Sequence, residues 1–597
     1  MQRLRLPAAL SLLAWLFIPA RLVTAQSLPG GLIGTSTTVA FVNVHVITMT
    51  SAQVLVGQTV LVAGGRIMAV GDRASVAVPK DATVVDGAGR YLLPGLVDAH
   101  VHLTTDMPWA PTRPDFGDAP LYLAHGVTTV VNLRGTTEIL DWRDRVASGQ
   151  ITGPTIYTSG EFVNEPRVLS VKDVEEEIRR QAEAGYDLIK FHEVWTPDTG
   201  FLTTSGLPRA TYDAMNLASA RSGLPLVGHA PVNLGLQALL ANRQPLAHLG
   251  ALSNLHFLPL ASNQVWLFVT AAALAALTIA LVVSGTAAFV RRRRRLDKHP
   301  GPAGPVTVRF VGGQVLLSVV LGACGISFLP GGPLFDSLAL RVVFTAVTIL
   351  MVATTVVSAA RTVRFWHADR RPLAARAHAA AIVCASAALA WTAVGFWSPL
   401  AWRSSDRGID RLAVRLRDAG VSVQTTLVAY DAIGGPGRAQ LVADPTIGFL
   451  RPETRRRWQR VAASTGPSGY RYTDFMVKVA GRLHRAGVPL VAGTDAMGLA
   501  LVAPGSSLHR ELELLVRAGL TPYEAIRAAT AAPASFLMRD RDFGTVTIGQ
   551  RADLLLVDGN PLENVGRLRQ PNGVMARGRW YPRQALDAMV APLAQQP

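Results

Sequence analysis

The fold is decided by the stretch Leu93-Pro94-Gly95-Leu96-Val97-Asp98-Ala99-His100-Val101-His102. A short apolar run here ends in two histidines that are two residues apart. In an extended strand, residues i and i+2 point to the same side, so both imidazoles can reach one metal ion. The rest of the chain therefore has to be searched for other strands that end in metal-binding residue types.

Short apolar runs of this kind recur along the chain and alternate with helical patterns such as 171–184, 209–222 and 474–486. Eight of them read as strands, at 96–99, 128–132, 155–158, 188–191, 226–229, 245–248, 421–427 and 489–493. Eight β/α units predict a (β/α)8 TIM barrel, in which the chemistry lies at the C-terminal ends of the strands.

Five of the eight predicted strands end in a metal-ligand type or a lysine. His100 and His102 close the first strand, and the others supply Lys190, His229, His248 and Asp495 in that order. Each residue alone has an ordinary structural explanation, such as a snorkelling lysine or an incidental histidine. Their coincidence at strand ends predicts one shared site.

The two ends of the chain have a different pattern. Residues 37–95 contain short strands broken by turns, and similar runs return only at 545–548 and 552–557. We expect both ends to form one small β-sandwich domain around everything between them. The predicted segments are 26–92 and 541–597 for the β-domain, and 93–257 and 404–540 for the barrel.

Residues 258–403 form a membrane insert by composition. The 597-residue chain carries only 17% charged residues, and the uncharged or nearly uncharged runs 265–290, 310–329, 342–360 and 379–402 are each near the length that spans a bilayer. We therefore expect four transmembrane helices. Both cysteines, Cys324 and Cys384, lie inside these runs, so no disulfide supports the barrel.

Charge and the N-terminus predict the orientation of the chain. Residues 1–25 read as a signal peptide, with a basic start, a short apolar run and small residues before Gln26. The linkers 291–309 and 361–376 carry net charges of +6 and +4, out of +17 for the chain. Basic linkers face the cytoplasm, so we expect an exported barrel on the extracytoplasmic side of a multi-pass membrane protein.

Several stretches resemble the amidohydrolase superfamily, in particular its imidazolonepropionase-like branch with prolidase-type dipeptidases. The resemblance rests on Leu93 to His102, Gly126-Val127-Thr128-Thr129-Val130, Val491-Ala492-Gly493-Thr494-Asp495, Ser507-Leu508-His509-Arg510-Glu511-Leu512, and Gly544 to Leu554. The membrane insert departs from typical members. Many relatives also carry Gly-His after strand three, where this chain has Gly160-Glu161-Phe162.

The resemblance implies a binuclear metal site that holds two divalent ions, with zinc fitting this ligand set. His100, His102 and Asp495 would hold the more buried ion, and His229 and His248 the second. Lys190, as its carbamate, would bridge both ions, because an ammonium group cannot ligate a cation. The ions would lower the pKa of a bridging water and polarise the scissile carbonyl, and Asp495 would carry the proton.

The implied function is an exported, membrane-anchored hydrolase that cleaves a C–N bond in a small amide or a dipeptide. Alternatives are a lactone or cyclic amide hydrolase with the same metals, and a membrane sensor that only binds a ligand. Arg134, His192 and Tyr430 are weaker candidates for substrate contacts. The run Arg455-Arg456-Arg457-Trp458 is more simply a solvated helix face than a nucleic-acid site, because no reading motif accompanies it.

The insert follows strand six directly, on the side of the barrel that bears the predicted metal ligands. We therefore expect the mouth of the barrel to face the membrane surface, with membrane lipid as a partner. An anchor without influence on substrate access is the alternative.

Overall fold

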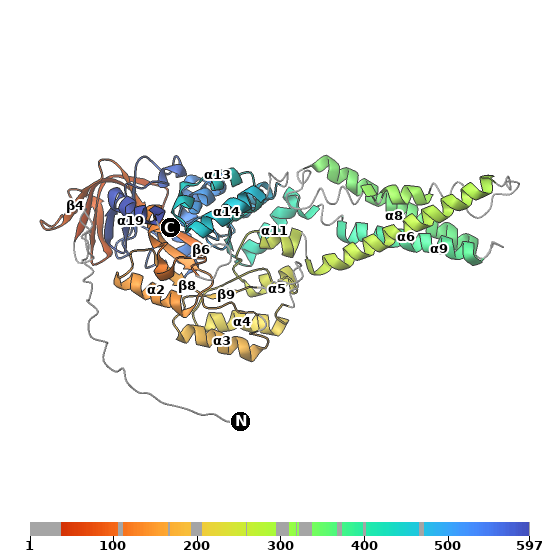
Figure 1. Cartoon of the computed structure of the whole chain (residues 1–597), viewed down its shortest axis with the longest axis horizontal. Coiled ribbons are helices and arrows are strands. Elements are labelled where there is room, and N and C mark those ends of the chain that lie inside the picture. The colour runs from red at the N-terminus through yellow and green to blue at the C-terminus, as the bar shows by residue number, and fades with distance from the viewer. Residues whose placement is uncertain are drawn as a thin grey trace, which may run out of the picture.

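The computed structural model describes residues 38–104, 111–164, 167–192, 206–257, 260–293, 310–317, 319–320, 337–366, 373–397, 402–464 and 471–595. The predicted signal peptide at 1–25 lies outside the described residues. Figure 1 shows three parts in a row: a β-sheet at one end, a mixed α/β body in the middle, and a bundle of long helices at the other end.

The β-sheet joins strands from both ends of the chain. Its order is β15-β14-β13-β5-β1-β2-β3, with β4 also paired to β1. Central to it is the antiparallel pairing of β5 with β13, which brings Leu93 against Leu555. The strands are β1 (Val39–Ile47), β2 (Val54–Ala63), β3 (Arg66–Asp72), β4 (Thr83–Asp86), β5 (Tyr91–Pro94), β13 (Leu554–Val557), β14 (Gly573–Ala576) and β15 (Arg579–Pro582).

The predicted sandwich is replaced by a single hydrogen-bonded sheet among these strands. The reason lies in β1, whose first half pairs with β4 while His45 and Val46 pair with β5. Asn43, at a φ of 55°, separates the two halves. A left-handed residue re-aims a strand locally, so one strand serves two neighbours on the same edge.

The middle of the chain contains parallel strands that neighbour each other in chain order. β6 pairs with β7, β7 with β8, β9 with β10, and β11 with β12, all in parallel. These strands are β6 (Leu96–Val101), β7 (Val127–Asn132), β8 (Thr155–Thr158), β9 (Ile189–Phe191), β10 (Leu226–Gly228), β11 (Val423–Gln424) and β12 (Leu490–Val491).

Isolated parallel bridges connect these pairs to one another. Ser159 pairs with Leu188, Leu246 pairs with both Gly228 and Val423, and Val101 pairs with Ala496. The pairings therefore return from the last strand to the first. The sixth predicted strand, 245–248, is reduced to the single bridging residue Leu246.

Helices cover the outside of the parallel strands. Their amphipathic faces are buried; α3, for example, buries Val174 and Ile178 and begins with a capping box between Ser170 and Asp173. The helices are α1 (Ala119–Ala124), α2 (Thr137–Ser148), α3 (Val171–Glu183), α4 (Arg209–Arg221), α5 (Gly235–Asn242), α11 (Asp406–Asp418), α12 (Leu427–Gly434), α13 (Arg438–Val442), α14 (Pro452–Ser464), α15 (Tyr472–Arg485), α16 (Ser506–Arg517), α17 (Pro522–Ala528), α18 (Ala531–Phe536) and α19 (Arg583–Gln595).

The bundle contains α6 (Leu260–Arg293), α8 (Leu338–Trp366) and α9 (Leu373–Thr392). Within the described residues, three helices are long and apolar enough to cross a membrane, at Phe268–Ala287, Leu338–Arg364 and Arg376–Gly395. This corrects the prediction of four. Of the remaining predicted span, 310–329, only 310–317 and 319–320 are described, and both are helical.

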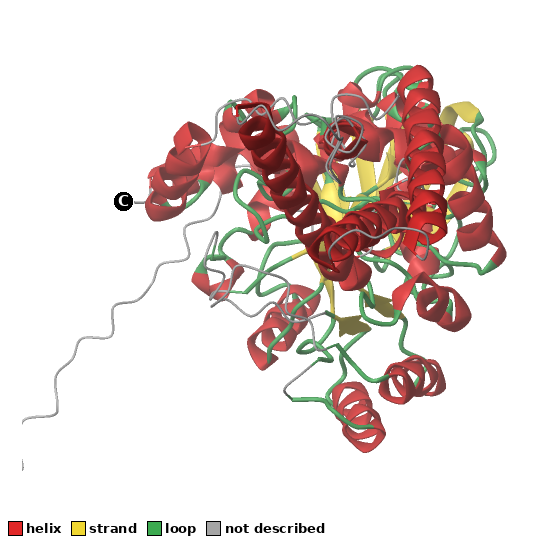
Figure 2. Cartoon of the chain, turned by 90° about the vertical axis from the view of Figure 1, so that its right-hand side faces the viewer, coloured by secondary structure: helices red, strands yellow, loops and turns green. Residues whose placement is uncertain are grey.

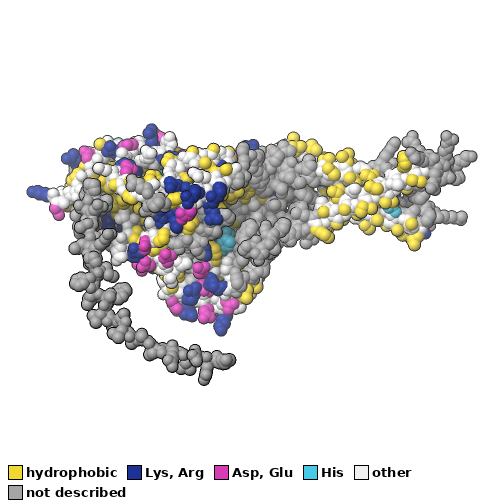
Figure 3. Space-filling view, viewed as in Figure 1, with side chains coloured by type: hydrophobic (Ala, Val, Ile, Leu, Met, Phe, Trp, Pro, Cys, Tyr) yellow, Lys and Arg dark blue, Asp and Glu magenta, His cyan; other side chains and the backbone are white. Residues whose placement is uncertain are grey.

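The bundle is apolar on its outside as well as in its interior. Phe268, Ile279 and Val363 are each more than 60% exposed, and Figure 3 shows hydrophobic side chains along the bundle, in contrast with the many charged side chains on the body. Inside, Ser284 and His378 lie 2.9 Å apart, and Gln314 donates to Thr354 at 2.6 Å. An apolar exterior with internal hydrogen bonds is the pattern that a lipid environment favours.

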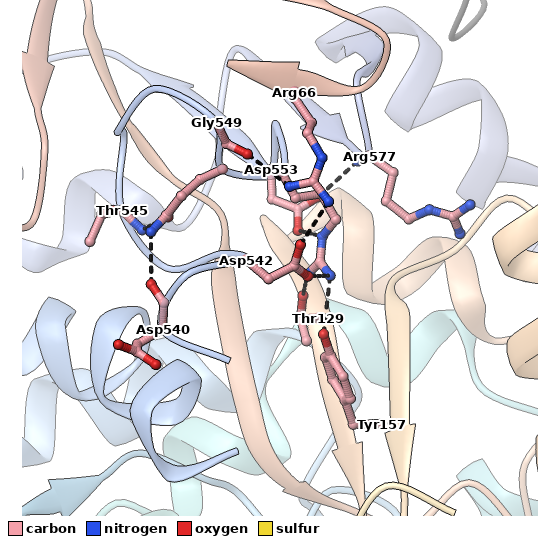
Figure 4. A network of polar contacts seen from close by, with 11 residues as sticks. Arg66, Thr129, Tyr157, Asp540, Asp542, Thr545, Gly549, Asp553 and Arg577 are labelled. Carbon is pink, nitrogen blue, oxygen red and sulfur yellow. Dashed lines mark hydrogen bonds and ion pairs between the residues drawn. The ribbon is translucent and has the colours of Figure 1, made fainter. Parts of the chain in front are cut away.

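A network of polar contacts joins the β-sheet to the parallel strands, and Figure 4 labels Thr129, Tyr157 and Asp553 within it. The Arg551 guanidinium donates to Asp553 at 2.6 Å, and it reaches Thr129 on β7 at 3.0 Å and Tyr157 on β8 at 3.2 Å. Asp542 completes the set at 3.1 Å. The side chain is mostly buried, so the two carboxylates among these partners compensate its charge.

Replacing Arg551 with leucine is expected to lower the free energy of unfolding by about 3–5 kcal/mol, because the change leaves the buried Asp553 carboxylate without this cation. Chemical denaturation of the full chain measures it. Arg66 also binds Asp542, at 3.1 Å, but its side chain is 52% exposed. The control Arg66→Leu should cost less than about 1 kcal/mol. Equal losses in the two variants would contradict this account of the junction.

Candidate metal centre

His100 on β6 and His102, directly after it, lie beside Asp495, which follows β12. His102 Nε2 is 2.9 Å from Asp495 Oδ1, and His100 Nε2 is 3.6 Å from the same oxygen. One ligand atom from each of the three residues falls within 4.8 Å of the others, and all three residues are buried. The β6–β12 junction thus brings together a His-His-Asp set that could hold a metal ion.

The other predicted ligands adjoin this set. The rings of His100 and His248 are 4.3 Å apart between centroids, and those of His248 and His229 are 4.9 Å apart. Lys190, on β9, is fully buried. Its Nζ has no hydrogen-bond partner among the described residues, yet it interacts electrostatically with Asp495. The structure therefore brings together all six predicted ligands.

Neighbouring side chains fix the histidine that lies deepest. Gln424 Nε2 donates to the carbonyl oxygen of Ala99 at 2.9 Å, so its Oε1 faces His100 Nδ1 at 3.0 Å as an acceptor. The proton of His100 is then on Nδ1. Its Nε2 is buried, has no hydrogen-bond partner among the described residues and keeps its lone pair for a cation.

Burial sets the charges of these groups. It lowers the pKa of His100 and His229 well below the ordinary value, and that of His248 to about 4, so the imidazoles are neutral. Burial likewise lowers the pKa of Lys190 to about 7. For Asp495, burial alone would raise the pKa, but the His102 hydrogen bond and nearby positive charge hold it below its usual value. Neutral imidazoles and an ionised carboxylate are the forms that bind metals, so the site fits a cation.

The backbone at this end of the strands is strained. His248, Thr426 and Asp495 have φ values of 65°, 43° and 66°, in the left-handed region that favours glycine. Such residues persist only where surrounding contacts hold them, and they cluster at functional sites.

The weaker candidates lie in different surroundings. The ring of His192 is 4.0 Å from that of His229 and stacks on Phe162 at 4.6 Å. The hydroxyl of Tyr430 accepts a hydrogen bond from the Gly250 N–H at 2.5 Å, beside the metal candidate His248. Arg134 is half-buried, two residues beyond β7.

Sequence reasoning missed the polar residues that support the ligands. Besides Gln424, these include Thr426, which lies 3.0 Å from His248, and Asp98. Asp98 accepts bonds from the Thr494 N–H and hydroxyl, at 3.0 and 2.6 Å, and ties the first strand to the last. The alternation of Gln424 and Thr426 along the seventh strand was the available signal, because residues i and i+2 share one face.

Comparisons with known proteins agree with this geometry. A model of the "Amidohydrolase family" matches residues 471–581, which include Asp495 and the α16 segment. The fold is similar to that of a crystal structure of an Xaa-Pro dipeptidase, with a TM-score of 0.50 and 16% identity over 92% of this chain and 100% of the other. The chain is thus similar to the amidohydrolase family in sequence over residues 471–581 and to an amidohydrolase-type dipeptidase in fold.

Curated amidohydrolase relatives match only part of the chain. Adenine deaminase of Rubrobacter xylanophilus is 39% identical over 103 residues, which is 16% of each protein. Ochratoxinase of Aspergillus niger is 39% identical over 92 residues, 15% of this chain and 18% of the relative. The chain thus matches less than a fifth of the length of these relatives.

Proposed function

We propose that the chain is a binuclear metal-dependent hydrolase that cleaves the C–N bond of a small amide or a dipeptide. The observation that carries the proposal is the convergence of five buried or partly buried ligand types and one buried lysine at one end of the parallel strands. We further propose that the closed order of parallel pairings is a (β/α)8 barrel, whose active sites lie at that end.

We propose that the ligands divide into two sets. His100, His102 and Asp495 would hold one ion, and the more exposed His229 and His248 would hold the second. The isolated Nζ of Lys190 suits conversion to a carbamate that bridges both, since an ammonium group would repel cations. Zinc fits this nitrogen and oxygen set, and when bound the ions would activate a water molecule and polarise the substrate carbonyl.

The chain's own groups then direct the reaction. Asp495 lies where it can accept the proton of the attacking water and deliver it to the leaving nitrogen. His192, between Phe162 and His229, is the candidate for contact with the substrate on the second-ion side. The loop after β8 has Gly160-Glu161-Phe162 where many relatives carry Gly-His, so we do not expect the substrate contact that this histidine makes in those relatives.

A substrate panel tests the activity. The purified full chain is assayed on dipeptides and N-acyl amides, with lactones and cyclic amides as the competing class. The proposal predicts amide turnover that a chelator abolishes and zinc restores. Turnover confined to lactones would replace the C–N assignment, and chelator-resistant turnover would contradict the metal mechanism.

We also propose that the bundle crosses a membrane and that the body lies on its extracytoplasmic side. Segments before and after the insert pair with each other, as at Leu246 and Val423, so both lie on one side of any membrane.

The placement of the bundle points to substrates at the membrane surface. The π-helix η2 (Ser253–Phe257) leads from His248 into α6, and Figures 1 and 2 show the bundle projecting from the body at the end opposite to the β-sheet. η2 is fastened to the body, because Ser253 bonds Tyr472 at 2.9 Å and Phe257 packs on Phe475 at 5.0 Å. We infer that the mouth of the site faces the bilayer.

The orientation toward the bilayer predicts a preference for substrates that bind membranes. A dipeptide amide with a lauroyl tail should have a kcat/KM about tenfold or more above that of the same amide without the tail. The reason is that each buried CH₂ adds about 0.8 kcal/mol of membrane affinity. The measurement uses the full chain in liposomes. Detergent micelles without bilayer are the control and should reduce the preference. Equal kcat/KM for both amides in liposomes would leave the bundle as an anchor only.

A further inference from the structure

The orientation of His248 cannot come from the β-ladder. Its strand consists of the single bridging residue Leu246, and His248 has a left-handed φ of 65°. What orients its ring is a hydrogen bond between His248 Nδ1 and Thr426 Oγ1, 3.0 Å long. The placement of this ligand therefore depends on the placement of Thr426.

Thr426 is itself in an unfavourable conformation. It is fully buried, and at a φ of 43° its β-branched side chain is in a region that such residues rarely adopt. A local structure of this kind costs on the order of 1–3 kcal/mol and has to be held by its neighbours.

Glu511, on α16, holds the residues on both sides of Thr426. Its carboxylate accepts hydrogen bonds from the Thr425 hydroxyl and, at 2.8 Å, from the Val428 N–H. Glu511 is completely buried, and these described partners are neutral donors. Burying the Glu511 carboxylate costs desolvation free energy. Its hydrogen bonds fix the turn that places Thr426 against His248.

Tyr430 closes the arrangement into a ring. Its hydroxyl is hydrogen-bonded to the Thr426 side chain and accepts from the Gly250 N–H at 2.5 Å, two residues after His248. With the Thr426 proton given to Tyr430, the Thr426 oxygen accepts from His248 Nδ1–H. The lone pair of His248 is then on Nε2, the atom that is left to bind a cation.

We propose that Glu511 is a positioning residue for the second metal ion, acting through Thr426 on His248. This proposal deepens the proposed function and rests on it. The His100 side has its own support in Gln424, which bonds Ala99 and not the Glu511 turn. The two supports are separate, so each should affect one ion.

The experiment measures metal binding by the metal-depleted full chain, titrated with Co²⁺ and Zn²⁺ and followed by absorption spectra and bound-ion counts. The variants Glu511→Gln and Thr426→Val are expected to weaken one ion about 10-fold or more, with the other unchanged. Gln424→Leu should instead weaken the other ion. Thr426→Ser keeps the hydroxyl and should behave as the wild type.

Glu513→Gln is the matched control on the same helix, because the Glu513 carboxylate pairs with Arg510 and Arg569, whereas that of Glu511 binds Thr425 and Val428. It should bind both ions normally. The inference is overturned if Glu511→Gln and Thr426→Val bind both ions as the wild type does, or if Thr426→Ser is as defective as Thr426→Val. A wild-type chain that binds no ion refutes the proposed function itself, and this inference with it.

Discussion

Asp495→Asn is expected to lower kcat by about 10²–10⁴-fold at saturating zinc, because asparagine cannot accept the proton of the attacking water. The carboxylate lies 2.9 Å from His102 Nε2 and stays ionised at neutral pH, since the hydrogen bond and nearby positive charge lower its pKa. Steady-state kinetics on the best substrate of the panel measure the change.

The control for Asp495 is Asp444→Asn, a carboxylate that caps a short 3₁₀-helix through Thr446, 2.8 Å away and outside the ligand set. It should retain kcat. We expect KM of Asp495→Asn to change far less than kcat. A variant that keeps both ions and at least a tenth of the wild-type kcat would remove Asp495 from the proton-transfer step.

Substitutions of Lys190 should cost about as much as those of Asp495. Losing the bridge between two ions forfeits several kcal/mol of transition-state stabilisation, or about 10³-fold in rate. Lys190→Ala leaves space beside the ligands, so short carboxylic acids added to the buffer should restore part of the activity. Lys190→Met fills that space and should not be rescued.

The same substitutions test the burial of Lys190. Its Nζ is buried without a hydrogen-bond partner in the described part of the chain, so it destabilises the metal-free fold. Lys190→Met should therefore raise the stability of the metal-free chain, by about 1–3 kcal/mol. If short carboxylic acids restored the activity of both Lys190→Ala and Lys190→Met, or of neither variant, the result would contradict a carbamate bridge.

Much of the site could be predicted because its metal-ligand residue types stand at the ends of strands that the sequence pattern identifies. The pair His100 and His102 follows from the two-residue period of a strand, and Asp495 follows from the adjacency of the first and last strands in a closed order. The sequence did not show how His248 would be held. The strand before His248 is reduced to one bridging residue, so a strand pattern does not determine the position of His248. The hydrogen bonds that hold it involve Thr426 and Glu511, which lie far along the chain.

The fold was predicted less completely for the same reason. Apolar runs identify strands and spans one at a time, but the number of sheets depends on pairing between distant segments. Asn43 divides β1 into a half that pairs with β4 and a half that pairs with β5, and this pairing yields one sheet. No local sequence pattern predicts it. The prediction of four spans gave the wrong count, because three helices among the described residues are long and apolar enough to cross a membrane.

The function depends on how these parts are combined. The segment that matches the amidohydrolase family model includes α16 and Asp495, whereas the bundle inserted after His248 lies outside that match. Glu511, on α16, and the bundle both act on the short segment that carries His248. The proposed second metal position thus lies on the segment that joins the body to the inserted bundle.

The central claim is tested most directly by counting metal ions in the purified full chain, by mass spectrometry of the elements, after reconstitution with zinc. The account predicts about two ions per chain, with Lys190→Met and His248→Ala each losing at least one of them. Fewer than one ion per chain, together with no turnover of any amide, would contradict the account.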